Sequence, residues 1–269
     1  MKRLLTALFL LLAFFRCAGR EPVVRGALGE LSVELSLPAG FNPQTDSCRL
    51  CIIMHGFWAN KNYAPIPHLA RFYRKRGFAT LRFDFGGCGK SEGASTDMTV
   101  ETEIADARAI YDYARSLPFV SGISFAGHSQ GAMVAGILAG RLEAEGLPVE
   151  SLTLLAPAAV IPDYARAGQF FGVTCDPVSP PESVSIYGYR IGRKYILEAQ
   201  QLRPYEETAL YSGPVSIIHG TADTVVPVEY GMRYAEVLSG GTFCPIPGET
   251  HFFLSACKLD RVLSGILGK

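Results

Sequence analysis

The sequence predicts an α/β fold in which a mostly parallel central sheet is flanked by helices. Strand-like and helix-like stretches alternate along the 269 residues, which is the pattern of a parallel sheet. Apolar residues make up 48% of the chain and charged residues 19%, which allows a large core and excludes a disordered chain. No repeat or linker divides the chain, so we expect one domain over residues 20–269.

Hydrophobic periodicity predicts the order of the elements. Residues 31–37 alternate apolar and polar side chains, as in a half-buried strand, and residues 50–54 form a continuous apolar run, as in a strand buried on both faces. Further strands are predicted at residues 79–85, 120–126, 152–155, 215–219 and 243–246. Helices are predicted at residues 66–76, 100–117, 130–142, 227–238 and 252–267.

The first nineteen residues are typical of a secretory signal. Lys2 and Arg3 precede a mostly apolar stretch over residues 4–15, and small residues follow. A bilayer span needs roughly 20 apolar residues, so a membrane anchor is the weaker interpretation. The residues before Cys17 are not small, which argues against lipid attachment there. We therefore expect an exported protein, periplasmic or extracellular.

The charge and cysteine patterns exclude several ligands. Lys plus Arg equals Asp plus Glu at 25 each, so no basic field favours nucleic acid. Residues 84–91 end in Gly-Lys-Ser, but Asp84 stands where a phosphate-binding loop needs glycine, so Asp84 and Ser91 are expected to be structural. Cys48 and Cys51 lie at the start of a predicted strand without a second pair, so we expect no zinc site. Disulfide pairing among the other cysteines stays open.

One segment interrupts the alternation of strands and helices. Residues 158–204, after the strand ending near Leu155, are rich in tyrosine, phenylalanine and proline and contain no clear strand. Structureless stretches this long are usually functional. We expect an insertion that covers the active-site end of the sheet as a lid, with one helix near residues 193–202.

A nucleophile motif follows the strand at residues 120–126. Gly127, Ser129 and Gly131 form the pattern G-x-S-x-G, and a predicted helix begins directly after it. Strand, sharp turn and helix are the context that a nucleophilic serine on an elbow requires. The serine then lies at a helix N-terminus, where free N–H groups can meet an anion.

A nucleophilic serine needs a base, and the base needs an acid that orients it. His251 lies in the loop after the last predicted strand, and Asp223 lies in the loop after the strand before it. The alternative interpretation of Asp223 as a helix cap fits poorly, because the next helix starts at Pro227. The chain order Ser129, Asp223, His251 is the order that this kind of elbow demands.

Two backbone N–H groups must stabilise the negative oxygen that forms during acyl transfer. The first candidate is Gln130, directly after the nucleophile. The second is Phe57, in the His-Gly-Phe-Trp turn that follows the strand at residues 50–54. The alternative is that this turn only ends the strand.

The chain resembles the α/β-hydrolase superfamily and, within it, the bacterial cinnamoyl (feruloyl) esterases. The resemblance covers residues 55–251. It rests on His-Gly-Phe at 55–57, Arg-Phe-Asp-Phe-Gly at 82–86, Gly-His-Ser-Gln-Gly at 127–131, Leu-Ala-Pro-Ala-Ala at 155–159 and His-Gly-Thr-Ala-Asp-Thr-Val-Val at 219–226. It implies an α/β-hydrolase fold with a lid, the triad and oxyanion donors named above, and no metal or organic cofactor.

The resemblance also implies a substrate, namely esters of ferulate and p-coumarate such as those on plant cell-wall saccharides. It implies Tyr195 and Asp163 as lid residues that bind the phenolic hydroxyl. Trp58 replaces a small polar residue common in such esterases and is expected to narrow the pocket mouth. Three alternatives stay open: a general short-chain carboxylesterase, a serine peptidase of the same fold, and an inactive binding protein. An inactive binding protein of this fold usually lacks a member of the triad, whereas this chain has Ser129, Asp223 and His251.

Overall fold

The structure, a computed structural model, describes residues 23–267. The predicted signal at residues 1–19, with Cys17, lies outside these residues. In the described part, no helix is both long and apolar enough to span a bilayer. The six cysteines of this part are all unpaired thiols.

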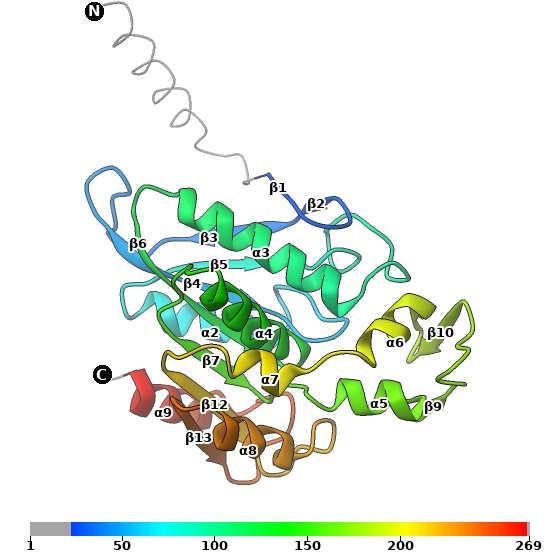
Figure 1. The fold of residues 1–269 in the computed structure, drawn as a ribbon. Helices are drawn as coiled ribbons and strands as arrows, with labels where there is room; N and C mark the ends of the chain where they lie inside the picture. Colours follow the sequence, from blue (N-terminus) through cyan, green and yellow to red (C-terminus); the bar gives the residue numbers. More distant parts are fainter. Residues whose placement is uncertain (1–22, 268–269) are drawn as a thin grey trace, which may run out of the picture.

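A seven-stranded sheet forms the centre of the fold, in the order β13-β12-β7-β6-β4-β5-β3 (Figure 1). All neighbouring pairs are parallel except the edge strand β3, which runs antiparallel to β5. Its strands are β3 (Val33–Ser36), β4 (Cys48–Met54), β5 (Ala79–Phe83), β6 (Val120–His128), β7 (Leu152–Leu155), β12 (Val215–Gly220) and β13 (Gly241–Ile246). The predicted mostly parallel sheet is confirmed.

Helices cover both faces of the sheet. They are α2 (Ile66–Arg74), α3 (Val100–Ser116), α4 (Gln130–Ala144), α7 (Pro204–Thr208), α8 (Val228–Val237) and α9 (Ala256–Leu267). One core contains residues of α3, α4 and α8, and a second core contains residues of α2 and α9. Strand β4 contributes Leu50 and Ile52 to the first core and Cys51 and Ile53 to the second, because successive strand residues point to opposite faces.

The predictions at residues 31–37 and 252–267 differ from the structure by more than a residue or two at their ends. The strand predicted at residues 31–37 is divided: β2 (Glu30–Leu31) pairs with β1 (Val24–Arg25), and only β3 joins the sheet. The helix predicted from residue 252 begins at Ala256. The residues before Ala256 form an irregular loop in which Phe253 has a φ of 48°, and this loop carries His251.

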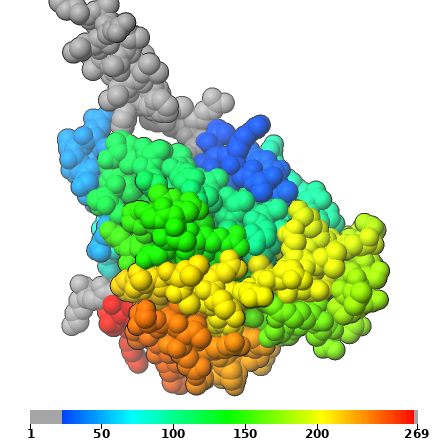
Figure 2. All heavy atoms as spheres, viewed as in Figure 1, coloured from blue at the N-terminus to red at the C-terminus, as the bar shows by residue number. Residues whose placement is uncertain are grey.

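The insertion at residues 158–204 contains strands that its sequence did not predict. Its elements are α5 (Ile161–Ala167), β8 (Gln169–Phe170), β9 (Val173–Thr174), β10 (Ser183–Ile186), β11 (Tyr189–Gly192) and α6 (Arg193–Ala199). The strands pair as two hairpins whose tips are Phe171-Gly172 and Tyr187-Gly188. The strands are too short for a periodic pattern, and an aromatic residue replaces the usual polar residue of a two-residue turn. Figures 1 and 2 show the insertion at one end of the molecule, beside the body of the sheet.

Candidate active site

Ser129 lies on a strained turn between β6 and α4. Its φ of 57° and ψ of −122° are unusual for a residue with a side chain. A Cβ at Gly127 would lie 2.5 Å from the carbonyl oxygen of Gly131, and a Cβ at Gly131 would lie 2.2 Å from that of His55. Both glycines of the motif are therefore required by close backbone packing, as the elbow interpretation expects.

The structure brings Ser129, His251 and Asp223 together at the carboxyl ends of the parallel strands. The Nε2 atom of His251 lies 3.0 Å from the Oγ atom of Ser129, and its Nδ1 atom lies 2.7 Å from Oδ2 of Asp223. All three side chains are buried. Because Nδ1 donates to the carboxylate, Nε2 is free to accept the hydroxyl proton of the serine. This is the arrangement that a nucleophilic serine needs.

Four donors surround the carboxylate of Asp223. Its Oδ1 atom accepts the backbone N–H groups of Val225 at 2.8 Å and Val226 at 2.9 Å. Its Oδ2 atom lies 3.3 Å from Nε2 of His219 in addition to the contact with His251. Burial alone would raise the pKa of Asp223, but these hydrogen bonds outweigh burial and hold the pKa well below its usual range. The acid therefore stays ionised.

Two further histidines support the triad. The sequence places His219 at a strand end, and its position four residues before Asp223 is the signal that points to their contact. His128 donates from Nε2 to the carbonyl oxygen of His251 at 2.8 Å, so it holds the backbone of the base. Burial, with the nearby His251, lowers the pKa of His128 to about 3, so this ring stays neutral. His128 therefore acts as a neutral hydrogen-bond donor to the backbone of the base.

Both predicted oxyanion donors flank the serine. Gln130 is the first residue of α4, where backbone N–H groups have no partner within the helix. Phe57 follows β4 and lines the same cavity as Ser129. A Cβ at Gly56 would lie 3.0 Å from Cβ of Ser129, so this loop packs directly against the nucleophile.

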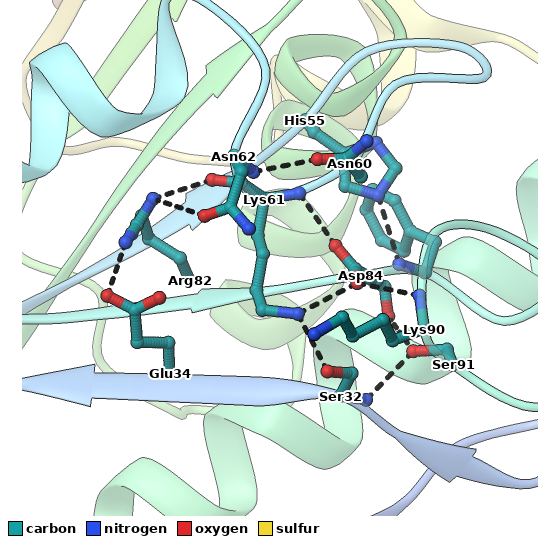
Figure 3. A network of polar contacts seen from close by, with 11 residues as sticks. Ser32, Glu34, His55, Asn60, Lys61, Asn62, Arg82, Asp84, Lys90 and Ser91 are labelled. Atoms are coloured by element: carbon teal, nitrogen blue, oxygen red, sulfur yellow. Dashed lines mark hydrogen bonds and ion pairs between the residues drawn. The ribbon is translucent and has the colours of Figure 1, made fainter.

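A buried ion pair holds the loop after β4 in place (Figure 3). The carboxylate of Asp84 accepts the backbone N–H of Lys61 at 2.7 Å and its Nζ at 2.8 Å. Lys61 Nζ also donates to Ser32, and Ser91 Oγ donates to the carbonyl oxygen of Asp84. The structural role expected of Asp84 and Ser91 is confirmed, and the network anchors the loop that carries Phe57.

Replacing Lys61 with methionine is expected to destabilise the protein by about 3 kcal/mol, because Asp84 would remain a buried charge without its partner. Chemical denaturation measures this loss. Lys194→Met, which breaks an exposed ion pair with Glu198, is the matched control and should change stability by less than about 1 kcal/mol. Adding Asp84→Asn to Lys61→Met should recover part of the loss. Equal stability of both single variants would contradict this account.

A cavity of about 440 Å³ opens at Ser129 and His251. Its walls are mostly aromatic, formed by Phe57, Trp58, Tyr63, Phe171, Tyr187, Tyr189 and Phe252. The ring of Trp58 stacks on Phe57 at 4.0 Å and on Tyr189 at 5.0 Å between ring centroids. Residues of the insertion and of the loop after β4 thus meet across this cavity.

Two residues predicted to bind substrate lie elsewhere. Tyr195 is 1% exposed, and its hydroxyl donates to Oε1 of Gln130 at 2.7 Å. Asp163 lies on the outer surface, where it accepts the hydroxyl of Tyr230 and pairs with Arg166. Neither residue lines the cavity at Ser129, whereas Trp58 does. The resemblance to cinnamoyl esterases places both residues in the insertion, but it does not determine the direction of their side chains.

These features define a serine hydrolase of the α/β-hydrolase fold. They are the serine on a strand–helix elbow, the buried acid and histidine that follow later strands, and the order of the strands in the sheet. Residues 45–181 match the family described as serine aminopeptidase S33, Hydrolase_4. The chain belongs to this family.

The chain is also similar to solved and curated proteins. A structure of Est1E from Butyrivibrio proteoclasticus with ferulic acid bound is 30% identical, with a TM-score of 0.82 over 89% of this chain and 96% of that one. Human protein ABHD12B is 26% identical over 198 residues, and lysophosphatidylserine lipase ABHD12 of Danio rerio is 28% identical over 209 residues. Each alignment covers 71% of this chain and 50% of the relative, so the chain spans about half the length of these curated relatives.

Proposed function

We propose that this protein hydrolyses carboxylic esters through an acyl-enzyme. The observation that carries the proposal is the chain of hydrogen bonds from Asp223 through His251 to Ser129, which ends in an open cavity. Ser129 Oγ attacks the ester carbonyl while His251 Nε2 takes its proton. The resulting oxyanion is stabilised by the N–H groups of Phe57 and Gln130. His251 returns the proton to the leaving alcohol and then activates the water that releases the acid.

The proposed substrates are esters of hydroxycinnamic acids, including feruloylated plant saccharides. The aromatic walls of the cavity suit a flat, conjugated acyl group, because aromatic rings pack favourably in stacked and edge-to-face pairs. The cavity volume of about 440 Å³ is within the usual range for small-molecule sites. The likeness to Est1E, whose structure holds ferulic acid, supports this choice.

A substrate panel tests the proposal. We expect kcat/KM for methyl ferulate and methyl p-coumarate to exceed that for methyl acetate, which has the same leaving group, by about tenfold or more, because an acyl ring gains about 1.5 kcal/mol of aromatic contact. An aminoacyl amide and a lysophosphatidylserine represent peptidase and lipase activity, and Ser129→Ala corrects for background. Preference for acetate would indicate a general short-chain esterase. Preference for the amide or the lipid would replace the proposal.

We also propose that the protein is exported and that its mature chain begins shortly after Gly19. The basic start, the apolar stretch over residues 4–15 and the small residues after it support this. N-terminal sequencing of protein from its native host tests it. A retained Met1 on cytoplasmic protein would contradict export, and a lipid on Cys17 would indicate anchoring.

A further inference from the structure

A fully buried chain of polar side chains lies behind the nucleophile. The side-chain amide of Gln130 donates from Nε2 to Oε2 of Glu103 at 2.7 Å, and its Oε1 atom accepts the hydroxyl of Tyr195 at 2.7 Å. These three side chains come from α4, α3 and α6, and each is at most 1% exposed. The chain thus joins the insertion to the helix that begins beside Ser129.

Packing alone does not explain these residues. Burying polar groups is unfavourable unless they are paired, and apolar side chains of similar size could fill the same space. The Oε1 atom of Glu103 is buried without a hydrogen-bond partner. Burial raises the pKa of Glu103 to about 8, although the hydrogen bond from Gln130 opposes this rise. At neutral pH the carboxyl group is therefore mostly uncharged.

The position of Gln130 gives this chain a consequence for catalysis. Gln130 is the first residue of α4, and its backbone N–H is one of the two oxyanion donors in the proposed reaction. Its side chain is held at both ends, by Glu103 on one side and by Tyr195 on the other. These contacts fix the orientation of the Gln130 backbone N–H. An oxyanion donor is effective when its N–H already points at the position of the developing oxyanion.

We propose that Glu103 and Tyr195 are positioning residues of the oxyanion hole, which hold the backbone N–H of Gln130 toward the reacting carbonyl. This inference rests on the proposed ester hydrolysis. Every ester develops the same oxyanion, so loss of this support should affect kcat equally for all esters. It should leave KM nearly unchanged, because neither Glu103 nor Tyr195 lines the cavity at Ser129.

Ionisation of Glu103 should oppose the reaction through its charge, although the carboxylate accepts a stronger hydrogen bond from Gln130. A negative charge would then lie behind the N-terminus of α4, where it opposes the developing oxyanion. The titratable groups that face Glu103 are Asp106 from α3, Cys88 from the loop after β5, and Tyr195 from α6. None of these three can supply a positive charge. We therefore expect kcat to fall as the pH rises through about 8, the pKa of Glu103.

Two variants and a matched control test the inference. Tyr195→Phe is expected to lower kcat by about tenfold for both methyl ferulate and nitrophenyl acetate, with KM within about twofold. In Glu103→Gln, the decline of kcat between pH 7 and pH 9, about tenfold in the wild type, should disappear. Tyr211→Phe is the control, since its buried hydroxyl donates to the carbonyl oxygen of Val149, away from the serine. Tyr211→Phe should lower Tm and leave kcat unchanged.

The outcomes separate this inference from the proposed function. Labelling of Ser129 by a fluorophosphonate, which also places an oxyanion in the hole, is measured beside turnover. Slow labelling of Tyr195→Phe supports the inference even if the wild type hydrolyses no ester in the panel, a result that would overturn only the proposed function. A loss confined to ferulate would overturn the inference, because Tyr195 would then contact the substrate. An unchanged alkaline decline in folded Glu103→Gln would also overturn it.

Discussion

Replacing Ser129 with alanine is expected to lower kcat/KM for ester hydrolysis by about 10⁴-fold or more. The substitution removes the Oγ atom that lies 3.0 Å from Nε2 of His251, so no acyl-enzyme can form. Alanine should fit the elbow, because it carries the same Cβ as serine. Hydrolysis of methyl ferulate is measured with purified variant and wild type, and far-ultraviolet circular dichroism checks the fold.

The control for this variant is a serine outside the site. Ser116 lies at the end of α3, where its hydroxyl donates to the carbonyl oxygen of Tyr113. Ser116→Ala should leave kcat/KM within about twofold of the wild type. Turnover of folded Ser129→Ala at the wild-type rate would remove the assignment of the nucleophile.

Replacing Asp223 with asparagine should lower kcat by about 10³- to 10⁴-fold. An amide can donate toward Nδ1 of His251, which would favour the tautomer that carries its proton on Nε2. That tautomer cannot accept the proton of Ser129. Asp112→Asn, on the exposed side of α3 and paired with Arg108, changes the same group away from the site and should not lower kcat. Equal rates for the two variants would contradict Asp223 as the acid.

The effect of Asp223→Asn on the free energy of unfolding is expected to depend on pH. The folded state holds the pKa of Asp223 well below its usual range, so the ionised carboxylate stabilises the fold above the unfolded pKa. This contribution is lost as the pH falls through the folded pKa. The difference in unfolding free energy between wild type and Asp223→Asn should therefore shrink from neutral to acid pH. A difference that grows on acidification would have the wrong sign.

The sheet and the triad could be predicted because their signals are local. The glycines around Ser129 mark the elbow, and Asp223 and His251 each follow a strand that its apolar residues reveal. In a parallel sheet the carboxyl ends of the strands meet at one edge. Local patterns were thus enough to place three residues that are far apart in the chain.

The strands of the insertion and the contacts of the Gln130 side chain could not be predicted in this way. These strands have two to four residues, which is too short for a period to appear. Gln130 and Tyr195 are separated by 65 residues, and Gln130 and Glu103 by 27. A tyrosine on a helix gives no local sign of which way its hydroxyl points. Only the packing of α3, α4 and α6 against one another decides these contacts.

The hydrogen bond between Tyr195 and Gln130 limits how freely the insertion can be exchanged. Residues 158–204 contain no member of the triad, so a different insertion could in principle bring a new acyl pocket to an unchanged catalytic centre. A donor insertion that lacks a hydroxyl at this point of α6 would leave Oε1 of Gln130 buried and unpaired. A designer who grafts insertions between relatives would therefore need to select for this one hydroxyl as well as for pocket shape.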